Sequence, residues 1–370
     1  MTPRTVGVEE EFLLVDPSDG QPRAVASAVL AADQARTPKE PAGEEDPAVE
    51  AELQLQQVET GTKPCRTLDE LDKQLRSTRR QAAEAARSRG VEIAAIGTSP
   101  VPVQAELTPA PRYRRMVRRF GMTVHEQLTC GCHVHVGVDD DEERVAVLDR
   151  IRPWLAPLHA LSGNSPFWQG EDSRYASYRS QVWARWPSAG PTELFGSAEA
   201  YHSAVTAMTD SGTVLDAGMV YFDARLSQHY PTVEIRVADV CLDAAHTLLL
   251  AALARALVET AARAWAAGHP PQPVRMELLR LAAWRAGRSG LDGDLVDPRT
   301  LLPAPARTVL DALLAHVHDA LEDAGELTEV HQLHEALWRD GTGAARQRSI
   351  YGRTGTLADV VADSVRRTQN

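Results

Sequence analysis

Carboxylate side chains stand at alternate positions in the segment 6–15, VGVEEEFLLV. In a β-strand, successive side chains point to opposite faces, so Gly7, Glu9 and Glu11 share one face. Two carboxylates two residues apart repel each other unless a cation lies close to both. This spacing indicates a cation-binding face, although an ordinary solvated glutamate pair is the plainer interpretation. Glu10 interrupts the apolar opposite face, and the pattern alone gives no physical account of it.

Two histidines alternate in the same way in the segment 130–138, CGCHVHVGV. His133 and His135 fall on one face between glycines that leave room for a ligand, although a structural role for this pair is equally open. The cysteines Cys130 and Cys132 fall on the opposite face with the valines. Strand parity therefore excludes a zinc site built from cysteines and histidines together.

The segment 231–240, PTVEIRVADV, places Glu234 and Arg236 side by side on one face of a strand. A carboxylate beside a guanidinium suits a metal ligand next to an anion-binding group. The alternative is a structural ion pair.

The segment 52–59, ELQLQQVE, adds Glu52 and Glu59. Their spacing of seven would put them on opposite faces of a regular strand, so a bulge or a loop is needed to bring both to one site. Across all these segments hard carboxylate oxygens outnumber other donors, which favours Mg²⁺ or Mn²⁺ over zinc.

Strand-like and helix-like segments are interspersed without the regular alternation of a doubly wound fold. No glycine-rich phosphate loop of the dinucleotide or Walker type is present. We therefore predict a single α+β domain over 1–370 with a mainly antiparallel sheet. The predicted helices are 67–89, 113–128, 141–161 and most of the chain from 243 on. The predicted strands are 6–15, 91–96, 130–138, 219–224 and 231–239, and residues 52–59 are also predicted to be extended. The predicted loops are 33–48 and 162–196.

The composition of the 370 residues limits the classes of partner. Asp and Glu number 51 against 39 Lys and Arg, giving a net charge of −12. An acidic balance argues against a nucleic-acid partner or an anionic membrane surface. Four cysteines are too few to form a disulfide framework in a chain of this length. The sequence shows neither a signal peptide nor an apolar run of about 18 residues that could span a membrane. We expect a cytoplasmic protein that is not bound to a membrane.

The chain resembles the bacterial carboxylate–amine ligases of the type-two glutamate–cysteine ligase family. The resemblance runs over essentially the whole sequence. It rests on GVEEEFLLVD at 7–16, ELQLQQVET at 52–60, EQLTCGCHVHVGV at 126–138, SPFWQGEDSRYASYR at 165–179, TVEIRVADV at 232–240 and GTGAARQR at 341–348. One departure is Thr98-Ser99-Pro100, where many members have Thr-His-Pro, so the acceptor used by this chain is open.

The resemblance implies a fold related to the catalytic domain of glutamine synthetase, in which a curved antiparallel sheet forms a saddle with helices behind it. It implies two metal ions, Mg²⁺ or Mn²⁺, and ATP in the concave face. By this resemblance the ligands of one metal are Glu9, Glu52 and Glu59, and the ligands of the second metal are Glu11, His133 and Glu234. The resemblance also implies that Arg236 contacts the transferred phosphoryl group. It implies that substrate or ATP is bound by His135, Arg174 and Arg179.

The chemistry implied is an ADP-forming ligation. A carboxylate, expected to be the γ-carboxylate of glutamate, becomes an acyl phosphate, and an amine such as cysteine then displaces the phosphate. Three alternatives stay open: a metal-dependent hydrolase, a metabolite-binding relative without activity, and a ligase of the same family for another acid and amine in secondary metabolism. The expected partners are small-molecule substrates, and a homodimer through the helical C-terminal region is a further candidate.

Overall fold

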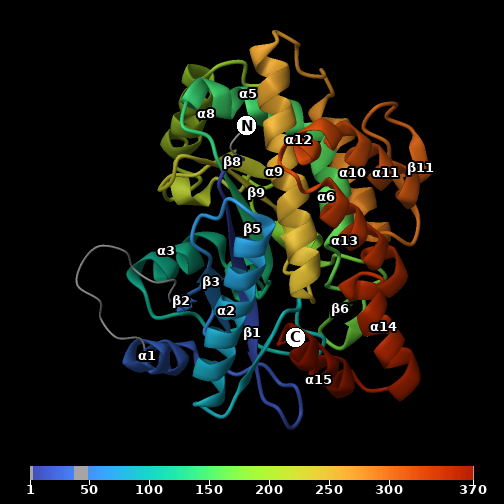
Figure 1. Ribbon diagram of the computed structural model, residues 1–370. Coiled ribbons are helices and arrows are strands. Elements are labelled where there is room, and N and C mark those ends of the chain that lie inside the picture. The colour runs from blue at the N-terminus through green and yellow to red at the C-terminus, as the bar shows by residue number, and fades with distance from the viewer. Residues whose placement is uncertain (1–2, 37–48, 370) are drawn as a thin grey trace.

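A seven-stranded sheet runs through the protein (Figure 1), which is described by a computed structural model covering residues 3–36 and 49–369. Its strand order is β2-β3-β1-β5-β9-β8, with β4 also paired to β1, and every pairing in it is antiparallel. The predicted mainly antiparallel sheet is thus confirmed. The strands are β1 (Val6–Val15), β2 (Val49–Ala51), β3 (Gln57–Gly61), β4 (Glu92–Ala94), β5 (Gly131–Gly137), β8 (Ala224–Leu226) and β9 (Thr232–Asp239). Two small sheets pair β6 (Phe167–Trp168) with β7 (Glu171–Asp172) and β10 (Asp294–Val296) with β11 (Pro303–Pro305).

Helices make up most of the remaining described chain, and two of the longest, α2 and α9, lie across one face of the sheet (Figure 1). The helix α2 begins with a capping box in which Thr67 and Glu70 satisfy each other's backbone N–H groups. The helices are α1 (Ala26–Arg36), α2 (Leu68–Arg87), α3 (Pro111–Phe120), α4 (Met122–His125), α5 (Asp141–Ile151), α6 (Leu155–Leu161), α7 (Arg179–Trp183), α8 (Ala198–Asp210), α9 (Ala244–Ala266), α10 (Met276–Ser289), α11 (Ala306–His316), α12 (His318–Asp323), α13 (Leu327–Asp340), α14 (Gly343–Thr354) and α15 (Leu357–Thr368), with 3₁₀ turns at Arg152–Trp154 and Ala217–Met219.

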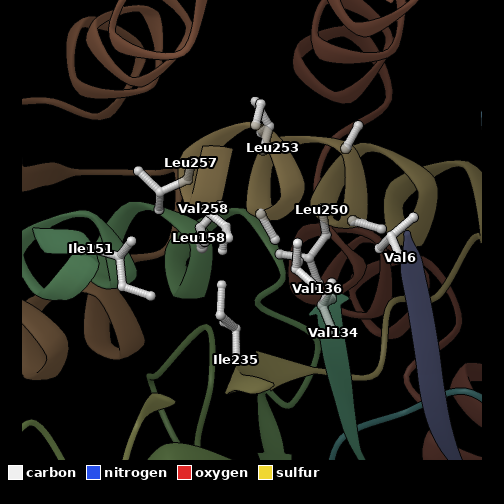
Figure 2. Packing of buried hydrophobic residues seen from close by; sticks show 14 of the residues in the cluster. Val6, Val134, Val136, Ile151, Leu158, Ile235, Leu250, Leu253, Leu257 and Val258 are labelled. Carbon is white, nitrogen blue, oxygen red and sulfur yellow. The ribbon is translucent and has the colours of Figure 1, made fainter. Parts of the chain in front are cut away.

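Alternate side chains of the central strands form an apolar face that packs against α5, α6 and α9 (Figure 2). Val134 and Val136 of β5 meet Leu250 of α9, and Ile235 of β9 lies near Leu158 of α6 (Figure 2). All five side chains are buried. Burying them stabilises each strand on this side by about 1.5–3 kcal/mol per large side chain, which leaves the other side of the sheet free to carry polar groups.

The helix α9 is the most apolar long helix among the described residues. Its 23 residues are long and apolar enough to cross a membrane by length and composition, yet 83% of its most apolar stretch is buried inside the protein. Its charged Arg255 pairs with Glu326 at the start of α13. The apolar surface of α9 is therefore used to cover the sheet.

Two predicted helices are interrupted where a residue does not continue the α-helical backbone conformation or its hydrogen bonds. The helix predicted over 113–128 divides into α3 and α4 at Gly121, whose φ of 53° leaves the right-handed helical region. The helix predicted over 141–161 changes to a 3₁₀ turn at Arg152–Trp154, where Pro153 has no N–H to donate.

Other predicted boundaries are also corrected. A strand predicted over 219–224 begins only at Ala224, because residues 217–219 form a 3₁₀ turn. The helix α8 was not predicted. Of the loop predicted over 33–48, residues 33–36 belong to α1 and residues 37–48 lie outside the described chain.

The structure accounts for Glu10, the acidic residue on the apolar face of β1. Its carboxylate accepts hydrogen bonds from Arg79 Nη2 at 2.6 Å, Arg79 Nε at 2.9 Å and Thr247 Oγ1 at 2.7 Å. The side chains of Glu10 and Arg79 are 1% and 2% exposed. Arg79 also donates to the carbonyls of Cys241 and Leu242. This buried pair ties β1 to α2 and to the chain that enters α9.

We expect the Arg79→Leu substitution to lower the free energy of unfolding by about 3–5 kcal/mol, because it leaves the buried Glu10 carboxylate without its cation. Urea denaturation measures this change. The matched control is Lys73→Leu on the same helix, where the exposed ion pair with Asp69 contributes at most about 1 kcal/mol. Equal effects of the two substitutions would show that the buried pair has no special role.

Candidate active site

The register of β1 against its two neighbours brings acidic and histidine side chains together on the face opposite the core. Glu9 lies directly opposite His133 of β5, and Glu11 lies directly opposite Glu59 of β3. Directly opposed residues of antiparallel strands have Cβ atoms about 4.5–5.5 Å apart and share a face. Pairing of three strands thus collects groups that are separated by up to about 120 residues in the sequence.

The strand β9 completes this face. His135 lies opposite Glu234, whereas the register shifts between Cys132 and Val134 of β5, so that Arg236 and Val237 together oppose His133. This β-bulge increases the local twist and turns the side chains that follow it. The Arg236 guanidinium donates to the Glu234 carboxylate and lies 3.4 Å from His133 Nδ1.

The loop between β2 and β3 brings Glu52 to the same place as Glu59. The strand β2 ends at Ala51, and Glu52 begins the loop, so strand parity no longer applies between the two glutamates. The Glu52 carboxylate accepts a hydrogen bond of 2.7 Å from the backbone N–H of Leu53. The loop start that the spacing of seven required is therefore present.

A cavity of ≈ 270 Å³ lies over this face of the sheet. Residues of α3, of α7 and the chain after it, and of the loop before β9 also line it. All six predicted metal ligands line it, together with two of the four other predicted site residues: Glu9, Glu11, Glu52, Glu59, His133, Glu234, His135 and Arg236.

Three of the glutamates are held in an environment that resists ionisation. Burial and the nearby charge of Glu52 raise the pKa of Glu11 to about 7. Burial raises the pKa of Glu52 as well. Burial and the charges of Glu52, Glu9 and Glu11 raise the pKa of Glu59 well above its usual range. Carboxylates crowded in this way are stabilised in the ionised form when a cation binds among them.

The other two glutamates already have cationic or hydrogen-bonding neighbours. Burial opposes ionisation of Glu9, but hydrogen bonds to His133 and His135 hold its pKa well below the usual range. Glu9 lies 3.2 Å from His133 Nδ1 and 3.2 Å from His135 Nε2. Burial likewise opposes ionisation of Glu234, and the charges of Arg236 and Arg225 lower its pKa. Burial and the charge of Arg236 lower the pKa of His133 to about 4, so the imidazole is neutral and able to act as a ligand.

The donor atoms form two sets that fit divalent cations. Those of Glu9, His133 and Glu234 lie within 4.8 Å of one another, and so do those of Glu11, Glu59 and His133. These sets group Glu9 with His133 and Glu234, and Glu11 with Glu59, whereas the division implied by the resemblance pairs them the other way. The buried Nε2 of His133 has no hydrogen-bond partner among the described residues, as expected for a ligand atom.

Arg179 and Arg236 lie under one tryptophan. The guanidinium carbon of Arg179 is 5.5 Å and that of Arg236 is 5.8 Å from the ring centroid of Trp183, a geometry that favours cation–π attraction. Arg179 passes over Gly131, where a Cβ would come within 2.3 Å of its Nη2. The Gly131 N–H donates to Glu11 at 2.6 Å, so the predicted Arg179 lies beside the carboxylate cluster.

Arg174, unlike Arg179, lies away from both the cavity and the carboxylate cluster beside it. Its side chain is exposed, its φ is 66°, and its N–H donates to Asp172 Oδ1 in the turn after β7. Its carbonyl accepts a hydrogen bond from Arg288 of α10, which fixes the turn away from the sheet. Ser99 is also outside, with its hydroxyl donating to the Val101 carbonyl at 2.8 Å.

Two residues of the site were not predicted. Arg225 of β8 lies opposite Glu234 and donates to it at 2.7 and 3.1 Å. Trp183 covers the two arginines from α7. The signal for Arg225 was weak because its three-residue strand is too short to show a period, and nothing in the sequence near Trp183 indicates which face of α7 meets the sheet.

Comparison with known proteins identifies the family to which the chain is similar. The family model described as "Glutamate-cysteine ligase family 2(GCS2)" matches residues 5–363. A protein of Streptomyces coelicolor named "Putative glutamate--cysteine ligase 2" is 56% identical over 366 residues, which is 99% of each chain.

The fold is similar to those of solved ligases. The structure of a glutamate–cysteine ligase from Francisella tularensis in complex with AMP has a TM-score of 0.69 at 14% identity, covering 100% of this chain and 89% of that chain. A bifunctional glutathione synthetase from Pasteurella multocida has a TM-score of 0.67 at 14% identity, covering 100% of this chain and 52% of that chain. These similarities confirm the predicted α+β fold class.

We expect Glu11, Glu52 and Glu59 to destabilise the metal-free protein increasingly as the pH rises from about 4.5 through about 7, whereas the buried, neutral His133 contributes in the opposite direction below about 6.5. The folded state holds protons on the three glutamates that the unfolded state releases near 4.5, so their contribution to stability is full below that value. Mg²⁺ or Mn²⁺ should restore it, and more at about pH 8 than at about pH 5, because only ionised carboxylates bind the cation.

Thermal unfolding with EDTA and with each cation measures this prediction. The Glu59→Gln variant is the internal comparison, since it removes one of the crowded charges and should flatten the dependence on pH. The same dependence of the melting temperature on pH in the wild type and in Glu59→Gln, both without a cation, would contradict it.

Proposed function

The chain belongs to glutamate–cysteine ligase family 2 and is a carbon–nitrogen ligase, and on that basis we propose that it activates a carboxylate with ATP and joins it to an amine. The proposed acid is glutamate, reacting at its γ-carboxylate. The observation that carries the proposal is the single cavity that combines a cluster of buried carboxylates with Arg236. Phosphoryl transfer needs cations and a guanidinium to neutralise charge on the transferred group, and this cavity offers ligands for both.

The residues of the cavity would have separate roles in such a reaction. Glu9, His133 and Glu234 would hold one divalent cation, and Glu11, Glu59 and Glu52 a second, with His133 near both. When bound, these cations neutralise charge on the phosphates of ATP. Arg236 is buried and fixed by Glu234 beneath Trp183, so its fork is oriented before the phosphoryl group arrives. His135 is fixed by Thr232 Oγ1 at 3.0 Å and lines the same cavity.

The steps are an ordinary acyl activation and substitution. The acid carboxylate attacks the γ-phosphorus of ATP, and ADP leaves with the bonding electrons. The amine nitrogen then attacks the acyl carbon, the carbon–oxygen bond to phosphate breaks, and phosphate leaves as the amide forms. No nucleophilic serine or cysteine is needed, and the four cysteines, all buried and free, take no part.

Incubation with ATP, Mg²⁺, glutamate and a mixture of amino acids and amines should yield ADP, phosphate and a γ-glutamyl amide. Coupled detection of ADP and mass spectrometry of the amide measure this outcome. A metal-dependent hydrolase would instead turn over an amide or a phosphate ester without ATP. The products AMP and pyrophosphate would contradict the acyl-phosphate route.

The Arg236→Lys substitution should lower kcat by about a hundredfold, or ~2.7 kcal/mol, because lysine keeps the charge but loses the planar fork that binds the phosphoryl group. The melting temperature should stay close to that of the wild type. Glu234→Gln, two residues away, should instead raise the Mg²⁺ or Mn²⁺ concentration needed for half-maximal rate. If neither variant changes turnover or metal requirement, the strand β9 is only structural.

A further inference from the structure

A second cavity of ≈ 570 Å³ adjoins the carboxylate cavity. It is lined by residues of α6, α7, α10 and the chain that leads into β8. The two cavities share three side chains, which are Trp183, Trp186 and Arg236. A ligand of the second cavity therefore lies next to the proposed reaction centre.

The second cavity carries more positive than negative charge. Its lining includes five arginines, which are Arg152, Arg179, Arg185, Arg236 and Arg280. Among the described residues that line it, Asp223 is the one acidic group. Burial raises the pKa of Asp223 to about 7, and the charges of Arg280 and Arg179 oppose that rise. A concave site with this balance of charge attracts anions.

The five arginines differ in how far the protein itself satisfies them. Three are held by other groups: Arg152 by backbone carbonyls, Arg185 by Glu126 and Arg236 by Glu234. Arg280 is exposed on α10, where water reaches it. Arg179 is the buried arginine for which the same account fails.

The guanidinium of Arg179 is withdrawn from water with few hydrogen bonds. The side chain is 3% exposed, and its Nη1 lies 4.0 Å from Asp239 Oδ1, too far for a hydrogen bond. Its Nη2 donates to the Arg236 carbonyl at 3.5 Å, and its buried Nε has no partner within the described chain. Buried donors without acceptors are costly, so this guanidinium is an open position for an anion.

The Asp239 carboxylate cannot serve as that anion, because other donors already occupy it. It accepts hydrogen bonds from the Asn164 N–H at 2.9 Å, from Ser165 Oγ at 2.7 Å and from Ser177 Oγ at 2.8 Å. Asp239 is fully buried, and these three donors fix its position. It offsets the charge of Arg179 and leaves the donors of Arg179 available.

The helix α14 supports the frame that holds Arg179. Gln347 of α14 donates to the Asn164 carbonyl at 3.0 Å and to Asn164 Oδ1 at 2.7 Å. A Cβ at Gly343 would collide with the Asn164 side chain, so glycine lets α14 approach this closely. The Arg179 N–H in turn donates to Ser165 Oγ at 3.0 Å. The backbone that carries the guanidinium is therefore fixed before any ligand arrives.

The other walls of the second cavity are apolar and largely aromatic. They include the rings of Trp183, Trp186, Phe222 and Trp284. Trp284 is 48% exposed. A volume of ≈ 570 Å³ lies within the range of about 300–1,000 Å³ of sites for drug-sized ligands. The space thus suits a ligand that joins an anionic group to a bulky apolar body.

We propose that Arg179 binds the carboxylate of the amine acceptor, which makes the acceptor an amino acid with a bulky apolar side chain. This inference rests on the proposed function and adds the class of acceptor to it. The carboxylate accepts hydrogen bonds from the planar fork of Arg179, and the side chain lies against Trp183 and Trp284. Glutamate, the proposed acid, has no apolar body, so the aromatic walls are left to the acceptor.

The first test compares two ligands that share a phenylethyl body and differ in the sign of their charge. Calorimetry measures the binding of 3-phenylpropionate and of 2-phenylethylamine to the wild-type enzyme with Mg²⁺ and ADP. We expect 3-phenylpropionate to bind at least about tenfold more tightly, because only its carboxylate can accept hydrogen bonds from Arg179. This comparison needs no variant and no turnover.

The second test changes the guanidinium. Arg179→Lys keeps the charge but loses the fork, and it should weaken binding of 3-phenylpropionate by about tenfold. The matched control is Arg275→Lys, the same change at an exposed position before α10, which should leave the affinity unchanged. Trp284→Ala removes part of the aromatic wall and should weaken binding by about threefold or more.

Turnover then distinguishes the acceptor from the other substrates. With ATP, Mg²⁺ and glutamate, kcat/KM for L-phenylalanine should exceed that for 2-phenylethylamine by about tenfold or more. Arg179→Lys should raise the KM of L-phenylalanine by about tenfold, while the KM values of glutamate and ATP change little.

The inference is overturned if 2-phenylethylamine binds as tightly as 3-phenylpropionate, or if neither ligand binds to the wild type. It is also overturned if Arg179→Lys binds 3-phenylpropionate as tightly as Arg275→Lys does, or if it raises the KM of glutamate or ATP instead of that of L-phenylalanine. Absence of ADP formation with every acceptor would count against the proposed function itself. The titrations would then still decide whether Arg179 binds a carboxylate in the second cavity.

Discussion

The carboxylates on the open face of the sheet repel one another, and the backbone register of the strands holds them in place against that repulsion. Glu11 and Glu59 lie directly opposite each other on paired strands, a position where like charges destabilise a sheet. Burial and the charge of Glu52 raise the pKa of both groups. Such an arrangement persists only if other interactions stabilise the folded state by more than this repulsion destabilises it.

This stabilisation comes from the opposite face of the same strands. Val134 and Val136 are buried against α9 and Ile235 against α6, and each stands next in the chain to a residue of the site. Alternation along a strand therefore gives every site residue a neighbour that anchors the backbone in the core. The buried pair of Glu10 and Arg79 adds a directional bond between the sheet and α2. Site and core are two faces of one structure, so a change in strand register would destroy both.

Arg236 is fixed from several sides. It lines the carboxylate cavity, it is held by Glu234, and the β-bulge of β9 sets its direction opposite His133. Trp183 covers it together with Arg179. A buried guanidinium with one carboxylate partner and an aromatic cover keeps hydrogen-bonding capacity for an incoming anion, and its Nε has no partner among the described residues.

The sequence by itself determined the polar and apolar faces of β1, β5 and β9, because a period of two is a local property that needs no knowledge of the partner strands. It also indicated the kind of ligand, since the donor types are fixed by composition. Only the tertiary structure decided which groups meet. The grouping of Glu9 with His133 and of Glu11 with Glu59 follows from the register of three strands, and the partner of Glu10 is 69 residues away in α2. Such pairings between distant segments are set by packing of the whole core, and a local pattern carries no record of them.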